Sequence, residues 1–524
     1  MSEVSTTWVQ GLKNPECYFH SVEQVKLIET HISWVVLTGC YAYKIKKPVK
    51  YSFVDFSTLE KRRWFCEEEV RLNRRLAPEV YLGIVPITGS PSNPHIDGHG
   101  PSFEFAVKMK QFSSEQEVYD ILVSGEKAGA CVSQLAERLA QFHAQIEKAG
   151  EHSPYGNPDM VWQPMQECLD EIPLHLLPPA TQKNLAGTEE WLLKEWRHLY
   201  EVFVQRKNEG YVRECHGDLH LGNIAVFEGK VCVFDALEFE PRLRWIDVLS
   251  EVAFLVMDLE KHGREDLAFV FLNRYLELTG DYEGLVIFRF YQIYRALVRA
   301  KVAGLRLAQL EEDGVEKEKA KNELCEYVEL AHRFVSCVPP VLIMMHGVSG
   351  TGKTTVSTEI VQAIGAIRVR SDVERKRLFA EISKTKTEDL QDDDLYHLDM
   401  TEHTYDRLGE LARILLQAGF SVVGDATFLR QHQRGLFSRL AQEQACAWFI
   451  VDVFAPEAVL AERIKRRSRE GRDASDATVA IMERQQEIDE HFTQAEQLHV
   501  IRVDSRDPQS IISAIKELKE KTGL

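Results

Sequence analysis

The sequence predicts a soluble protein of more than one domain that combines α+β and α/β folds. Three observations support this class. The chain has 524 residues, more than one ordinary core holds, since domains usually have about 100 to 200 residues. Helical patterns with a few short strands fill residues 1–337, and strands and helices alternate over 338–524. We therefore expect a mixed first domain over 1–337 and a three-layer α/β/α domain with a parallel sheet over 338–524.

The first domain is expected to begin with a small sheet and to continue mainly as helices. A turn at Thr38 and Gly39 inside a β-branched and aromatic stretch predicts a hairpin. Prolines Pro339 and Pro340 end the helical region and place the domain boundary. The other predicted elements are strands over 103–109, 224–227 and 230–234, and helices over 57–76, 134–148 and 186–207, with several more helices expected from 246 to about 334.

The second domain is expected to alternate strands and helices. The predicted strands are 341–345, 366–370, 421–423 and 448–454, and the predicted helices are 354–364, 405–418 and 459–467. This alternation is typical of parallel strands joined by crossover helices.

The composition excludes several classes of protein. Hydrophobic residues make up 44% of the chain and charged residues 27%, which is typical of a globular protein. No apolar run could cross a bilayer and the first residues show no signal-peptide pattern, so we expect a cytoplasmic protein without a membrane partner. A net charge of -18 disfavours nucleic acid as a partner. Ten cysteines without a CxxC pair indicate reduced thiols.

A glycine-rich loop follows the first strand of the second domain. Its sequence fits G-x-x-x-x-G-K-[ST], and a helix is predicted straight after it. In such a P-loop, backbone N–H groups and the helix N-terminus bind phosphates, the lysine reaches the outer phosphates and the hydroxyl binds Mg²⁺. The competing interpretation is a glycine turn without a ligand. The predicted ATP-binding residues are Gly347, Val348, Ser349, Gly350, Thr351, Gly352, Lys353, Thr354 and Thr355, with Thr354 also a metal ligand.

Polar residues follow two further strands of this domain. Asp372 and Arg375 come after the second predicted strand, and Asp425 comes at the end of a later one. Ligands of such folds bind where the carboxyl ends of the strands meet. Asp372 is predicted to accept a proton from a substrate hydroxyl, and Asp425 to hold Mg²⁺ indirectly.

An arginine-rich helix follows, with Arg463, Arg466 and Arg467. Arginines can stabilise charge on a transferring phosphoryl group, although an exposed basic helix is the competing interpretation. The order of motifs over residues 341–500 resembles small P-loop kinases that include gluconate kinase, zeta-type toxins and the kinase part of polynucleotide repair enzymes. The resemblance implies that Asp372 is the general base, that Arg375 contacts a substrate phosphate or orients the substrate, and that the three arginines form a lid. It does not identify the substrate.

The first domain carries a second group of polar residues. His216, Asp218 and Asn223 show the spacing H-x-D-x-x-x-x-N, and Asp235 follows the next strand. A kinase-like site needs this arrangement, because Asp218 can deprotonate a hydroxyl while Asn223 and Asp235 hold Mg²⁺ at the nucleotide phosphates. Two other interpretations stay open, a metal site of His216, Asp218 and His220 and a hydrogen-bonded turn.

A lysine and a glutamate upstream complete this site. Lys44 and Lys46 share one face of a predicted strand, and we choose Lys44 as the residue that contacts the nucleotide phosphates. On the following helix we choose Glu69 as its partner, with Glu68 as the alternative. The backbone over residues 108–111 is predicted to contact adenine.

Residues from about 30 to 300 resemble the aminoglycoside phosphotransferase and choline-kinase-like family, which has a protein-kinase-like bilobal fold. The resemblance implies that Asp247 braces the catalytic loop from a helix start. The sequence departs from protein kinases in its single glycine at Gly39 and in Asp235-Ala-Leu-Glu, which replaces Asp-Phe-Gly. The whole chain resembles a bacterial two-domain family in which this module precedes a P-loop kinase domain.

Together the motifs predict a bifunctional phosphotransferase that moves the γ-phosphate of ATP to a hydroxyl of a small molecule with Mg²⁺. Two alternatives stay open. One module could be a regulatory nucleotide sensor, or the P-loop domain could phosphorylate polynucleotide 5′ ends.

Overall fold

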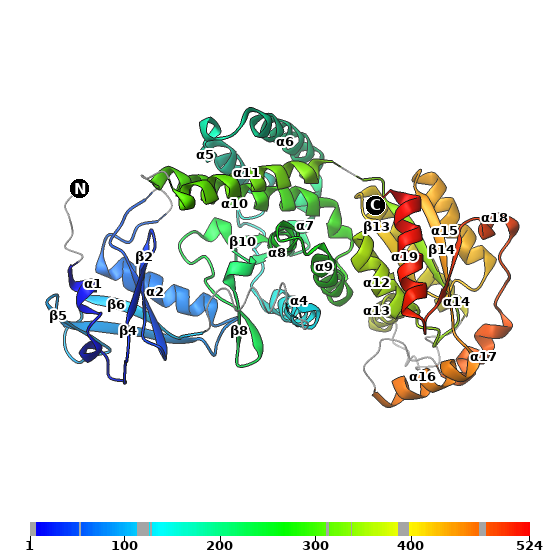
Figure 1. Cartoon of the computed structure of the whole chain (residues 1–524), viewed down its shortest axis with the longest axis horizontal. Coiled ribbons are helices and arrows are strands. Elements are labelled where there is room, and N and C mark those ends of the chain that lie inside the picture. Colours follow the sequence, from blue (N-terminus) through cyan, green and yellow to red (C-terminus); the bar gives the residue numbers. More distant parts are fainter. Residues whose placement is uncertain are drawn as a thin grey trace. The chain divides into compact units, whose positions relative to one another are not determined.

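The computed structural model describes residues 7–51, 54–112, 125, 128–310, 314–336, 338–385, 398–470 and 478–523. The chain forms two compact units, whose elements are labelled in Figure 1. The first unit contains residues 1–176, 192–258 and 295–324, and the second contains 177–191, 259–294 and 325–524. The predicted boundary between residues 337 and 338 stays a prediction, because compactness does not show which segments fold on their own.

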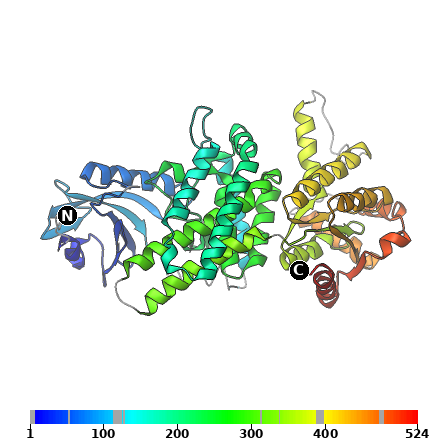
Figure 2. The same ribbon diagram turned by 90° about the horizontal axis from the view of Figure 1, so that it is seen from above.

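The first unit begins with a six-stranded antiparallel sheet (blue in Figure 2) in the order β1-β2-β3-β6-β4-β5. The pairing of β2 with β3 confirms the predicted hairpin. Helix α2 (Leu59–Asn73) lies against β4 and β6, and it begins after Thr58, whose hydroxyl accepts the N–H of Lys61. The strands are β1 (Lys26–Glu29), β2 (Ser33–Leu37), β3 (Tyr41–Lys46), β4 (Tyr81–Ser90), β5 (Asn93–Ile96) and β6 (Glu104–Lys110).

Helices and two short antiparallel strand pairs form the rest of the first unit. The pairs are β7 (Val212–Glu214) with β10 (Trp245–Asp247), and β8 (Ile224–Phe227) with β9 (Lys230–Val233). The helices are α4 (Ala128–Gln145), α5 (Pro158–Glu171), α6 (Pro179–His198), α7 (Tyr200–Asn208), α8 (Val248–Lys261), α10 (Phe288–Gln309) and α11 (Val315–Val335). Of these, α6, α8, α10 and α11 contribute residues to both units.

The second unit is built on a five-stranded sheet in the order β12-β13-β11-β14-β15. Every neighbouring pair is parallel, which confirms the predicted α/β sheet. The strands are β11 (Val341–His346), β12 (Ala366–Arg370), β13 (Ser421–Asp425), β14 (Ala447–Phe454) and β15 (Val500–Asp504). The helices that belong wholly to this unit are α9 (Glu265–Thr279), α12 (Lys353–Ile364), α13 (Ser371–Thr385), α14 (Leu398–Gln417), α15 (Gln431–Glu443), α16 (Glu457–Glu470), α17 (Val479–Glu487), α18 (Gln494–Gln497) and α19 (Pro508–Thr522).

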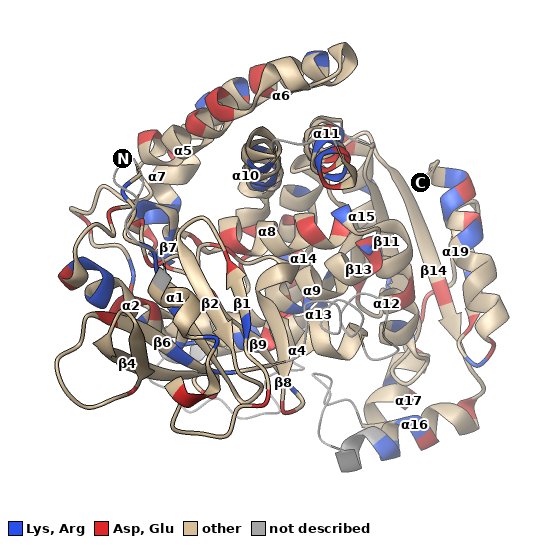
Figure 3. Ribbon diagram, turned by 60° about the vertical axis from the view of Figure 1, so that its left-hand side comes forward, with Lys and Arg blue, Asp and Glu red and all other residues tan. Residues whose placement is uncertain are grey.

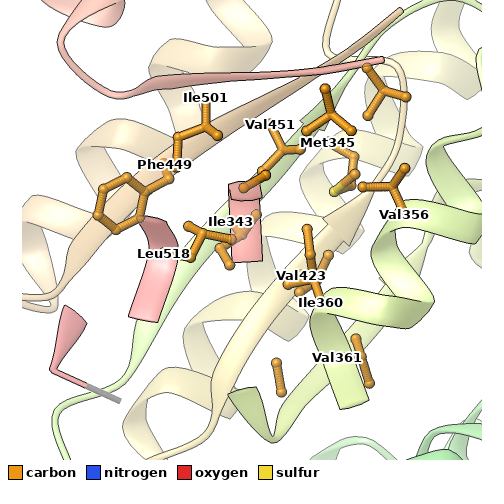
Figure 4. Close-up of a cluster of buried hydrophobic side chains, with 14 of the residues drawn as sticks. Ile343, Met345, Val356, Ile360, Val361, Val423, Phe449, Val451, Ile501 and Leu518 are labelled. Carbon is orange, nitrogen blue, oxygen red and sulfur yellow. The ribbon is translucent and has the colours of Figure 1, made fainter. Parts of the chain in front are cut away.

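The core of the second unit explains why residues 341–345 of β11 are all apolar. All six residues of β11 are buried, because strands flank it on both sides and helices cover both faces of the sheet. On one face, side chains of β11, β13, β14 and β15 pack against α12 and α19 (Figure 4). Helices α14 and α15 lie against the sheet as well.

The structure differs from the sequence-based expectations in several elements. The helix expected over 186–207 is two helices, α6 and α7, separated at Leu199. Strands β4 and β5 were not predicted, because Gly83, Pro86 and Pro94 are residues that usually interrupt strands. None of the described helices combines the length and the apolar composition that crossing a bilayer requires.

Candidate active sites

The first candidate site lies on the loop between β7 and β8. Asn223 Nδ2 donates to the backbone carbonyl of Asp218 at 2.9 Å and to its Oδ2 at 2.8 Å. His220 Nε2 lies 3.4 Å from the same carboxylate. Burial acts to raise the pKa of Asp218, but His220, His216 and Arg299 together outweigh it, and the pKa lies below the ordinary value of an aspartate. Asp218 is therefore ionised at neutral pH, as a general base must be.

His216 holds this loop to the segment after β9, since its Nε2 hydrogen-bonds the carbonyl of Phe234 at 3.0 Å. The other ring nitrogen, Nδ1, accepts the backbone N–H of Asp218 at 3.3 Å, so both nitrogens that could bind a metal already have hydrogen-bond partners in the protein. Among the described residues, the His, Cys and acidic side chains close enough to share a metal ion are instead His143, Cys215 and Glu251, whose ligand atoms lie within 4.8 Å of one another. There Glu251 already binds His143 at 2.8 Å.

Lys44 on β3 connects the sheet to the metal-binding aspartate predicted after β9. Its Nζ lies 3.0 Å from Glu69 Oε1 on α2, and it also donates to Asp235 Oδ1. Burial acts to lower the pKa of Lys44, but Asp235 and Glu69 outweigh it and raise the pKa well above the ordinary value. Asp235 has φ of +64°, a strained conformation for a residue other than glycine that is frequent at functional sites. The backbone N–H of Asp235 donates to the hydroxyl of Tyr81 at 3.2 Å.

Lys46 also contacts Glu69, so a contact with Glu69 does not by itself show which lysine would bind the nucleotide phosphates. Its second partner is Glu238, and the Lys46 side chain is fully buried. Lys44 is the lysine that reaches Asp235. Glu68, the alternative to Glu69, pairs with Arg71 and Arg244 instead.

The backbone expected to contact adenine is engaged in the sheet. The N–H of Lys110 donates to the carbonyl oxygen of Val80 at 2.9 Å, and the N–H of Gln111 donates to the carbonyl oxygen of Cys40 at 3.1 Å. These two donors are therefore not available to a nucleotide in this structure. Residues 113–124, which follow, lie outside the described residues.

Two acids on α8 that were not predicted hold the loop that carries Asp218. Glu251 Oε1 accepts the N–H of Gly217 at 2.7 Å, and Asp258 Oδ2 accepts the N–H of Leu221 at 2.8 Å. Acidic positions on α8 are red in Figure 3. Asp247, which was expected to brace the loop, instead forms a buried ion pair with Arg206 and caps α8. The seven-residue spacing of the two acids, two helical turns, is a signal that could have placed them on one face.

Replacement of Glu251 by alanine should destabilise the first unit. The change leaves the buried N–H of Gly217 and the imidazole of His143 without this partner, which costs about 2–4 kcal/mol. Urea unfolding followed by circular dichroism would measure it. Glu201→Ala at an exposed position of α7 is the matched control, with an expected change of at most about 0.5 kcal/mol. Equal urea midpoints of unfolding for the two variants would contradict the proposal that Glu251 stabilises this loop.

The second candidate site lies between β11 and α12. Gly347 and Gly352 have φ of +132° and +97°, which disfavours side chains, and a Cβ at Gly347 would lie 2.4 Å from the carbonyl oxygen of Val453. Lys353 Nζ donates to the carbonyls of Gly347 and Val348 at 2.8 and 3.0 Å. The loop thus curves around the lysine at the start of α12, which is the shape of a phosphate cradle.

The predicted acids of this unit lie at the ends of neighbouring strands. Asp425 is the last residue of β13 and accepts the hydroxyl of Ser357 at 3.3 Å. β12 ends at Arg370, so Asp372 lies in the first turn of α13, where Arg375 Nη1 is 3.1 Å from its Oδ1. Because β12 and β13 are paired in parallel, both acids lie at the carboxyl edge of the sheet.

The three predicted lid arginines have different environments. Arg463 Nη1 donates to the P-loop carbonyl of Thr351 at 3.2 Å and to Ser505 Oγ at 2.8 Å, so it holds the loop itself. Arg466 is exposed on α16. The side chain of Arg467 lies outside the described residues. Thr355, predicted to contact ATP, is also exposed.

Two further contacts at the P-loop were not predicted. His346, directly before the loop, lies between Asp452 at 2.8 Å and Asp489 at 3.2 Å. The N–H of Ser349 donates to Gln485 Oε1 on α17 at 2.7 Å. Sequence patterns carry no signal for such contacts, because more than 100 residues separate the partners.

The donor sets of both sites suit ATP and Mg²⁺. Hard oxygen ligands are available from Asn223 and Asp235 in one site, and from Thr354 and Asp425 in the other, as Mg²⁺ prefers. The P-loop also requires glycine at position 347, because a Cβ there would lie 2.4 Å from the carbonyl oxygen of Val453.

Comparison with known proteins gives the class of each region. Residues 120–286 match the model of the phosphotransferase enzyme family, and residues 342–490 match the model of an AAA domain. These matches confirm both resemblances, and with them a two-domain α/β architecture of a phosphotransferase-family region followed by a P-loop region.

Similarity over almost the whole chain identifies the family. The uncharacterized protein Rv2004c of Mycobacterium tuberculosis is 31% identical over 485 residues, which cover 90% of this chain and 93% of that protein. The chain belongs to the same family as this mycobacterial protein.

Solved structures resemble parts of the chain. A gluconokinase from Sinorhizobium meliloti is 22% identical, with a TM-score of 0.25, and the match covers 36% of this chain and 97% of that one. An amicoumacin kinase solved with AMP-PNP and Ca²⁺ is 12% identical, with a TM-score of 0.37, and the match covers 60% of this chain and 90% of that one.

Proposed function

We propose that the protein has two sites for ATP-dependent phosphate transfer, each of which moves the γ-phosphate to a hydroxyl of a small molecule. The observation that carries the proposal is the first site, where one lysine contacts Glu69 and Asp235 and an asparagine holds Asp218. The phosphotransferase-family match covers the loop with Asp218 and Asp235. The P-loop geometry supports the second site.

In the first site, Asp218 accepts the proton of the acceptor hydroxyl while the hydroxyl oxygen attacks the γ-phosphorus of ATP. The bond between the γ-phosphorus and the ADP oxygen then breaks. Glu69 positions Lys44 toward the phosphates. Asn223 orients Asp218 and offers its amide oxygen to the metal, together with Asp235. When bound, Mg²⁺ would neutralise charge on the phosphates.

In the second site, Asp372 takes the role of the base. Arg375 lies against it and is placed to orient the acceptor. The backbone N–H groups of the P-loop and Lys353 would bind the phosphates, while Thr354 would hold Mg²⁺ and Asp425 would hold it indirectly. The hydrogen bond from Ser349 to Gln485 must open if this N–H is to donate to a phosphate.

A transfer assay tests the proposal. The full-length protein would be incubated with γ-labelled ATP, Mg²⁺ and separate pools of sugars, nucleosides, aminoglycosides and 5′-hydroxyl oligonucleotides. We expect label on a small-molecule pool. Label on oligonucleotides alone would favour the polynucleotide-kinase alternative. If ATP binds but no pool is labelled and no ADP forms, the regulatory-sensor alternative is preferred for both modules.

A further inference from the structure

Helix α9 lies in the second unit and binds the edge strand of its sheet. Asn273 Nδ2 donates to the carbonyl of Ala366 at 2.9 Å, and Asn273 Oδ1 accepts the N–H of Arg368 at 2.6 Å. One side chain thereby satisfies a donor and an acceptor of β12, as a neighbouring strand would. Asn273 is buried, so these bonds are protected from water.

One helical turn further, Glu277 on α9 binds two arginines of β12. Glu277 Oε1 lies 2.7 Å from Arg368 Nη2, and Oε2 lies 3.7 Å from Arg370 Nη1. The Glu277 side chain is only 5% exposed, and both guanidinium groups are largely buried. Charges in this position interact more strongly than exposed pairs do.

The two arginines in turn contact the residues that we expect to hold the metal. Arg368 Nη1 donates to Thr358 Oγ1 at 2.6 Å and to the carbonyl of Thr354 at 3.3 Å. Arg370 Nε lies 3.7 Å from Asp425 Oδ2. Glu277 is therefore two contacts away from both predicted metal ligands, Thr354 and Asp425.

We propose that Glu277 is a positioning residue of the P-loop site and sets its requirement for Mg²⁺. By sharing the charge of Arg370, Glu277 limits the attraction between this arginine and Asp425. Without the Glu277 carboxylate, Arg370 pairs more closely with Asp425 and competes with the metal for it. Glu277 lies inside the region that matches the phosphotransferase family, residues 120–286, and outside the region that matches the AAA domain, residues 342–490. The P-loop site is thus completed by a residue from the other family region.

This inference rests on the proposed function of the P-loop site and is tested by binding rather than by turnover. The full-length Lys44→Ala variant removes the lysine of the first site, so calorimetry with AMP-PNP reports the P-loop site. In this background, Glu277→Gln should raise the Mg²⁺ concentration for half-maximal binding about tenfold. Glu283→Gln, at a more exposed pair with Arg407, is the matched control and should leave it unchanged.

A second substitution separates positioning from a loss of structure. With Arg370→Gln already present, Glu277→Gln should no longer shift the Mg²⁺ requirement, because the competing cation is gone. A wild-type Mg²⁺ requirement in Glu277→Gln, or the same shift with and without Arg370, would overturn the inference while leaving the proposed function intact. If the Lys44→Ala protein binds no AMP-PNP at any Mg²⁺ concentration, the proposed function of this site fails, and the inference fails with it.

Discussion

Replacement of Lys353 by alanine is expected to reduce phosphate transfer at the P-loop site by about a hundredfold or more. In the structure the ammonium group lies within the loop, where it donates to the carbonyls of Gly347 and Val348. It is therefore placed to bind the phosphates and to stabilise charge that develops on them. The rate of label transfer to the acceptor found for this site would measure the effect.

The control for this variant is Lys516→Ala, which removes an exposed lysine of α19 in the same unit. Its transfer rate should equal that of the wild type. Since a nucleotide should also stabilise the folded unit, ATP should raise the unfolding temperature of Lys516→Ala more than that of Lys353→Ala. Unchanged transfer and unchanged ATP affinity in Lys353→Ala would contradict the assignment of the P-loop.

Replacement of Asp218 by asparagine is expected to reduce transfer at the first site by about a thousandfold, within the usual range for loss of a general base. The asparagine keeps the size of the side chain but cannot accept the proton. Because His220 holds the pKa of Asp218 below its ordinary value, the base is ionised at every pH above about 5. The rate of the wild type should therefore show no acid limb from this residue between pH 5 and 7.

Asp170→Asn is the matched control, since this aspartate of α5 is exposed and contacts Gln166. It should transfer phosphate at the wild-type rate. If Asp218→Asn kept the wild-type rate with every acceptor, Asp218 would not be the base and the first module would be better explained as a nucleotide sensor.

The two sites differ in how much of them the sequence could predict. Residues of the P-loop are consecutive, so their spacing alone indicates the turn, the lysine and the following helix. Asp218 and Asn223 are likewise five positions apart on one loop. Lys44 and Glu69 could be paired because the strand and helix that carry them follow each other closely.

Contacts between distant segments explain what the sequence did not show. Glu277 meets Arg368 across 91 residues, and Gln485 meets Ser349 across 136. The relevant side chains come together only because α9 covers the edge strand and α17 lies at the P-loop. The family resemblance predicted that Asp247 braces the loop of Asp218. In the structure, the N–H groups of Gly217 and Leu221 in this loop donate to Glu251 and Asp258.

The number of nucleotides bound per chain tests the central claim most directly. Calorimetry with AMP-PNP and saturating Mg²⁺ would be performed on the wild type, Lys44→Ala and Lys353→Ala, and on the variant with both changes. We expect two sites in the wild type, one strong site in each single variant and none in the double variant. One site in the wild type that persists in both single variants would contradict the presence of two phosphate-transfer centres.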